Sequence, residues 1–233
     1  MDDEKGNNFK INNQEEILNY LIKTVKELKN ENMELKKRLI NLENWKKEFE
    51  ENQIEKDKQN FNSKIMNKKE QIDLIKNKFK KRGLTIKKLN LLFSSSEEGD
   101  SSQIVHNKID GKENILMLVK TTKGRKFGGY TNIGFDSSQS TKEDNEAFLF
   151  SLDKLKTYDN IKEENAIFCS KDTVPFFYSN FGNYNIKIEN KFFSKDGYTT
   201  KKGDCYETTE DYEINGGEER FVVKELEFFQ IIF

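Results

Sequence analysis

The sequence predicts an α+β protein, in which a long N-terminal coiled-coil helix precedes a mainly antiparallel β-sandwich of two sheets with short flanking helices. Three observations support this fold class. Residues 15–82 contain neither glycine nor proline, a run longer than an ordinary globular helix. Leucine recurs within that run at heptad spacing. After Leu91, short apolar segments alternate with polar turns, which is typical of a two-sheet sandwich.

The composition agrees with a division into two parts. Charged residues make up 35% of the 233 residues and hydrophobic residues only 34%, which is too polar for one uniform globule. We expect a disordered N-terminus over residues 1–14 and a coiled coil over 15–82. The coiled coil comprises a zipper at 17–50 and a looser helical spacer at 51–82, and a β-rich domain at 87–233 follows it.

The zipper carries an apolar seam. With Leu18 at heptad position a, five successive d positions are apolar, and four of them are leucine. Leucine at d, with Val25 and Asn32 at a, favours two parallel strands, because two buried asparagines can hydrogen-bond each other. We therefore predict a homodimer. The dimerisation residues are Leu18, Leu21, Val25, Leu28, Asn32, Leu35, Leu39, Leu42 and Phe49.

The charged flanks of the seam agree with pairing between identical chains. In a parallel pair, Glu31 faces Lys36 of the second copy, and Arg38 faces Glu43, so both contacts are attractive. The alternative is a single amphipathic helix packed on its own domain.

The heptad ladder stops after Phe49. A second apolar stripe, from Phe61 to Phe79, is out of phase with the first and indicates a stutter or a break. Gly83 is a natural stop for the helix. The basic stretch 76–88 is read as a solvated helix end, where cations suit the helix dipole, in preference to a contact for phosphate or acidic lipid.

In the second half of the chain, short apolar runs between polar turns predict β-strands. A short amphipathic helix is predicted at 87–94, carrying Leu89, Leu92 and Phe93. Gly128 and Gly129 stand inside a strand pattern, which suggests a bend or a close backbone approach. A phase change in the last strand predicts that it is buried on both faces or has a bulge near 224–225. The predicted strands are 115–122 and 125–131, paired as a hairpin, with 147–152, 166–170, 184–189 and 221–233.

These segments carry a resemblance. The series KKLNLLFSSSEEGDSSQIVHNKIDGK, ILMLVKTTKGRKFGGYT, EAFLFSLD and ELEFFQI resembles the TLDc domain of the oxidation-resistance family, over residues 87–233. FGGYT followed by AFLFSL is its most specific part. Phe135 stands where the family usually has a tryptophan, and NFGNYNIKIEN matches the family's glycine-rich stretch only loosely. The resemblance implies two packed antiparallel sheets with short flanking helices.

The residues that catalysis or metal binding would need are scarce. The chain has one histidine and two cysteines, too few for a Cys/His metal cluster. His106 is expected in a loop with a structural hydrogen-bonding role, Cys169 buried in a strand, and Cys205 exposed. Acidic residues at 204–219 are expected to form a solvated face. We therefore predict no catalytic residue, no cofactor and no metal site.

The leading functional hypothesis is a non-enzymatic interaction protein. The resemblance implies protection against oxidative stress and, in several family members, binding to the vacuolar proton-pumping ATPase. One alternative is a thiol-dependent peroxide scavenger using Cys205; another is nucleic-acid contact through 76–88. The net charge of −1 predicts no general attraction to nucleic acid or anionic membranes. Without an apolar run of membrane-spanning length or a signal-peptide pattern, we expect a cytoplasmic protein.

Overall fold

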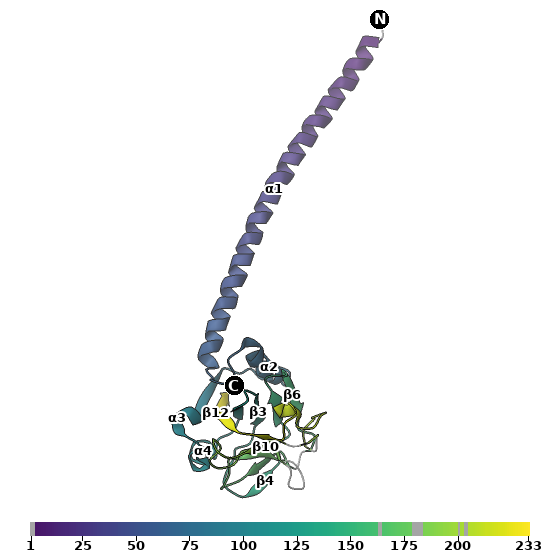
Figure 1. Ribbon diagram of the computed structural model, residues 1–233. Helices are drawn as coiled ribbons and strands as arrows, with labels where there is room; N and C mark the ends of the chain where they lie inside the picture. Colours follow the sequence, from purple (N-terminus) through teal and green to yellow (C-terminus); the bar gives the residue numbers. More distant parts are fainter. Residues whose placement is uncertain (1–2, 163–164, 179–183, 200, 203–204) are drawn as a thin grey trace. The chain divides into compact units, whose positions relative to one another are not determined.

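The computed structural model describes residues 3–162, 165–178, 184–199, 201–202 and 205–233, with backbone only for 3–13 and 58. The chain divides into two units, Met1–Lys56 and Asp57–Phe233. Helix α1 (Asp3–Asn60) fills the first unit and is unbroken (Figure 1). It begins within the predicted disordered stretch 1–14, of which residues 1 and 2 lie outside the described residues.

The second unit is built mainly from short strands, with helices near its start (Figure 1). Its elements are α2 (Lys69–Lys80), β1 (Lys88–Ser94), α3 (Ser95–Glu98), α4 (Ser102–Ile109), β2 (Ile115–Thr121), β3 (Lys126–Thr131), β4 (Ser140–Lys142), β5 (Phe148–Ser151), β6 (Lys156–Asp159), β7 (Ile167–Cys169), β8 (Phe176–Tyr178), β9 (Tyr184–Lys187), β10 (Gly197–Thr199), the 3-10 helix η2 (Glu213–Asn215), β11 (Arg220–Phe221) and β12 (Val223–Ile232).

The strands form two antiparallel sheets, which confirms the predicted fold class. The first sheet has the order β1-β12-β2-β3-β5-β6, and the second has the order β11-β10-β9-β8-β7-β4. The predicted hairpin is the β2–β3 pair, with Met117 opposite Gly129. The bulge expected near 224–225 is also present, as a register shift between Val223 and Glu225 where β12 pairs with β2.

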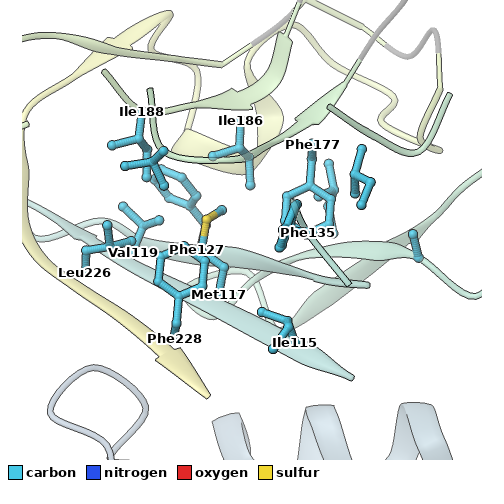
Figure 2. Close-up of a cluster of buried hydrophobic side chains, with 14 of the residues drawn as sticks. Ile115, Met117, Val119, Phe127, Phe135, Phe177, Ile186, Ile188, Leu226 and Phe228 are labelled. Atoms are coloured by element: carbon cyan, nitrogen blue, oxygen red, sulfur yellow. The ribbon is translucent and has the colours of Figure 1, made fainter. Parts of the chain in front are cut away.

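An inner cluster of apolar side chains fills the space between the sheets (Figure 2). Met117 and Val119 of β2 and Phe127 of β3 point from the first sheet toward Phe177 and Ile186 of the second. The alternate residues of β2 point the other way, into a second cluster. Because β2 is buried on both faces, its sequence is a continuous apolar run rather than an alternating one.

The second, outer cluster is covered by residues 61–80, which the sequence assigns to a helical spacer at 51–82. Helix α1 instead ends at Asn60, and α2 begins at Lys69. The physical reason is the apolar outer face of the first sheet, which needs a cover. The second apolar stripe supplies it, and its members are Phe61, Ile65, Ile72, Ile75 and Phe79, all buried. The compact unit thus starts at Asp57 rather than at 87.

Segment 87–94 is not the predicted helix but the edge strand β1, paired with β12. Its register shifts between Leu91 and Phe93. The bulge turns the strand over, so that Leu89 joins the outer cluster and Phe93 the inner one. Apolar residues separated by this bulge imitate the three- and four-residue spacing of a helix.

The two glycines of β3 allow close packing on both faces of the first sheet. A Cβ on Gly129 would lie 2.5 Å from Cζ of Phe177, in the second sheet. A Cβ on Gly128 would meet the carbonyl of Met117 and lie 2.7 Å from Cζ of Phe150. The predicted close approach of a backbone is therefore found at Gly128, whereas the close neighbours of Gly129 are side chains.

Candidate functional site

The predicted seam lies along helix α1 as an exposed apolar stripe. Its eight apolar members, from Leu18 to Phe49, have exposed fractions between 52% and 63%. An isolated helix gains no packing energy from these side chains, and most helical stability in proteins comes from covering such a face. Covering each Leu would contribute about 1.5–3 kcal/mol. The stripe is therefore the part of the described surface that most needs a partner.

The geometry of the stripe favours a coiled-coil partner. On a straight α-helix, a seven-residue repeat drifts by about 20° per heptad around the axis, and a left-handed supercoil takes up this drift. Asn32 lies exposed in the middle of the stripe, between the apolar residues Leu28 and Leu35. Pairing of this stripe with a second copy remains a prediction.

The charged flanks are available to a partner. Arg38 lies 3.8 Å from Glu34 of its own helix, and both side chains are well exposed, so that this ion pair contributes little. Glu31, Lys36 and Glu43 are also exposed. Among the residues of the first unit that the structure describes, Glu31, Lys36 and Glu43 form no ion pair, and Arg38 has only this exposed contact.

His106 is held in a structural network. It lies buried in helix α4 rather than in the predicted loop. Its Nδ1 is 3.0 Å from Oδ1 of Asp110, and its Nε2 is 2.9 Å from the carbonyl oxygen of Thr173. Ser137 donates over 2.9 Å to Oδ2 of Asp110, which also lies 3.2 Å from Nδ1 of the ring. The arrangement of Asp110, His106 and Thr173 cannot activate a nucleophile, because Nε2 of His106 faces a carbonyl oxygen instead of a hydroxyl or thiol.

Neither cysteine is accessible to a substrate. Cys169 is buried in β7 as predicted, and desolvation raises the pKa of its thiol to about 11. Cys205 was expected to be exposed, and that prediction is wrong: its side chain is fully buried. The neighbouring Tyr206 bridges to Asn160 and donates to the carbonyl of Ala166 over 2.8 Å, which draws Cys205 into the core. A reactive cysteine needs a thiolate and access to solvent.

The basic stretch 76–88 binds acidic groups of its own unit. Lys76 pairs with Asp57 over 2.6 Å, and Lys78 pairs with Asp159. Arg82 pairs with Glu146 over 2.9 Å and lies 5.2 Å from the ring centre of Phe148. The contacts of Lys78 and Arg82 fasten this stretch to the first sheet, whereas Lys80 and Lys81 stay exposed.

The acidic segment near the C-terminal end contains one deeply buried carboxylate. Glu213 of η2 accepts from Lys156 over 2.8 Å and from the backbone of Thr209 over 2.7 Å. Burial opposes its charge, but these hydrogen bonds prevail and hold the pKa of Glu213 at about 2. The predicted solvated acidic face is thus wrong at Glu213, while Asp204 lies outside the described residues.

A second buried carboxylate fastens the turn that follows α1. Glu227 of β12 accepts from the hydroxyl of Ser63 over 2.5 Å and from the backbone of Lys64 over 2.9 Å. Burial raises the pKa of Glu227, because the loss of water outweighs these hydrogen bonds, which lower the pKa. Its role is to hold the cover of the outer cluster in place.

Within the described ranges, no group of three or more His, Cys, Asp or Glu side chains is arranged to hold a metal ion. No helix in the described part of the chain is long and apolar enough to cross a membrane.

The resemblance implied two packed antiparallel sheets with short flanking helices, and the structure has both. The sequence profile of the TLDc domain matches residues 24–232. The chain belongs to the TLDc domain family. The membership points to the oxidation-resistance family in general. A search of curated proteins gives no match. The TLDc match begins within α1, earlier than the resemblance at 87–233 suggested.

Sequence reasoning missed the residues that join α2 to the TLDc sheets. Arg82, Glu146 and Asp159 are far apart in the sequence and carry no motif. The second apolar stripe was the signal available in the sequence, because its spacing places Ile72, Ile75 and Phe79 on one face of a short helix.

Proposed function

We propose that this chain is a non-enzymatic interaction protein, in which two copies pair through the seam as a parallel coiled coil and present two TLDc domains to a partner. The observation that carries the proposal is the exposed stripe from Leu18 to Phe49. The g and e positions beside it attract between identical parallel chains. The oxidative-stress role comes from membership of the family.

The non-enzymatic part rests on the chemistry of the described residues. Both thiols are buried, and the ring nitrogens of His106 face a carboxylate and a carbonyl. We expect the purified chain not to consume hydrogen peroxide, and the Cys205→Ser variant to behave identically. Peroxide consumption that the substitution abolishes would overturn this part.

The proposed partner is the vacuolar proton-pumping ATPase, as in several members of the family, and a cytoplasmic location goes with it. The test is capture of ATPase subunits from a lysate by the full chain. Recovery of those subunits supports the partner, and repeated failure to recover any contradicts it.

The test of pairing is sedimentation equilibrium of the full chain. We expect a dimer for the natural sequence and a monomer for the double variant Leu28→Glu with Leu35→Glu, because four carboxylates would face one another in the seam. The matched control is Asn30→Glu with Lys37→Glu, which places the same residues at heptad position f, away from the seam. A monomeric natural chain, or a dimer that survives the seam double variant, would contradict the proposal.

A further inference from the structure

One end of the seam carries an aromatic pair. Trp45, the single tryptophan of the chain, stacks on Phe49, with ring centroids 5.5 Å apart and an interplanar angle of 23°. Both rings remain more than half exposed. Trp45 occupies heptad position g and Phe49 position d, so the stack turns the indole toward the seam.

A lysine stands between these rings in the heptad. Lys46 falls at position a, where a side chain points into the seam of a coiled coil. Glu43 and Glu50 are one turn away on the same helix, yet among the described residues Lys46 is in no ion pair. Its charge is therefore unmatched at a position that pairing would cover.

Pairing of two parallel copies would bring Lys46 next to the indole of the other chain. An a side chain inserts between the residues at a and d and the preceding d and g of the facing helix. For Lys46 these are Lys46, Phe49, Leu42 and Trp45 of the second copy. The two Lys46 ammonium groups would repel each other at the coiled-coil axis. If each lysine side chain bends away from the axis, its ammonium group moves toward the face of Trp45 of the other copy.

We propose that Lys46 of each copy lies over Trp45 of the other, and that this reciprocal cation–π contact sets the parallel, in-register pairing at the end of the zipper. This inference rests on the proposed dimer. An antiparallel pair would place Lys46 among different residues, so that the contact is specific to the parallel arrangement. Asn32 and Lys46 then act as two polar a layers that select the same register.

The test is a double-mutant cycle on the full chain, with Lys46→Met and Trp45→Leu alone and together, and the dimer dissociation constant measured by sedimentation equilibrium. Methionine keeps an unbranched stem and removes the charge. Two symmetric contacts of this kind predict a coupling of about 5- to 30-fold in the dissociation constant. The matched control replaces Lys47, at position b, by Met in the same cycle, and should show no coupling.

The outcomes separate the two proposals. A natural dimer with about fivefold coupling or more supports the contact. A natural dimer with smaller coupling, or with equal coupling in the Lys47 cycle, overturns the contact and leaves the proposed function standing. A chain that stays monomeric overturns both. As a second readout, the emission of Trp45 should shift to shorter wavelength as the chain dimerises, and an unchanged emission across that range overturns the contact.

Discussion

Phe79 of α2 meets Tyr130 of β3 edge to face, with ring centroids 4.7 Å apart and an interplanar angle of 85°. Phe79 also packs against Phe148, and its side chain is fully buried. Edge-to-face pairs add about 0.5–1.5 kcal/mol to the effect of burial. The contact joins a segment outside the predicted domain to the centre of the first sheet.

Replacing Phe79 by Ala should therefore destabilise the second unit, because the cavity lies beneath its cover. We expect a loss of about 3–5 kcal/mol in the free energy of unfolding. Urea unfolding followed by near-UV circular dichroism measures it. Lys80→Ala, one residue further along and exposed, is the control; equal stability of the two variants would contradict the role of α2.

Gly129→Ala should destabilise the sandwich, because the added methyl group meets the ring of Phe177 across the two sheets. We expect a loss of about 1–3 kcal/mol. Thermal unfolding measures it. In the Phe177→Leu background, which lacks the ring, Gly129→Ala should cost less stability than in the natural chain. If the stability losses of the two single variants simply add in the double variant, the clash with Phe177 does not explain the effect.

Glu213→Gln should cost stability in a pH-dependent way. The pKa of Glu213 is about 2 in the fold against an ordinary value of 4.5, so its contribution is present above pH 4.5 and is lost as the pH falls toward 2. The contribution amounts to roughly 3 kcal/mol at neutral pH. Denaturant unfolding at several pH values tests this, with the exposed Glu210→Gln as control.

Glu227→Gln should act in the opposite sense. Burial raises the pKa of Glu227 above 4.5, so the fold favours the protonated carboxyl, and this contribution is lost as the pH rises through the folded pKa. We expect the variant to be at least as stable as the natural chain at pH 7 and its melting temperature to change less between pH 4.5 and 7. The exposed Glu113→Gln should leave the natural profile unchanged, and a large loss of stability at pH 7 in Glu227→Gln would refute the argument.

Asn32→Val should raise the stability of the paired arm and weaken its choice of two strands, because valine removes the hydrogen bond between the two copies. The expected result is a higher melting temperature together with species larger than a dimer. Sedimentation velocity distinguishes these species. A variant that remains a strict dimer would weaken the role assigned to Asn32.

Sequence reasoning located the strands whose own residues carry the signal. β2 is a continuous apolar run, and the bulge in β12 shows as a change of phase. β1 was mistaken for a helix because its bulge changes the spacing of Leu89 and Phe93. The short strands β4, β6, β8 and β10 have few residues each, and their partners rather than their sequence define them.

In the candidate site, too, only features set by local sequence are predictable. Heptad spacing is local, so every residue of the seam from Leu18 to Phe49 can be named from the sequence. Cys205 is buried because Tyr206 contacts Asn160 and Ala166, which are distant in the sequence. The polar residues next to Cys205 in the sequence give no sign of these contacts. His106 has hydrogen-bond partners as expected, but it lies on a helix rather than in the predicted loop.

The position of β12 governs the order in which this protein can fold. The strand pairs with β1 on one side and β2 on the other, and both precede it by most of the length of the second unit. During synthesis the first sheet therefore stays open until β12 has emerged, and such long-range pairing is slow. Helix α1 needs only local contacts and forms within microseconds. The pairing proposed for the arms could therefore begin on a polysome, while both sandwiches are still unfinished.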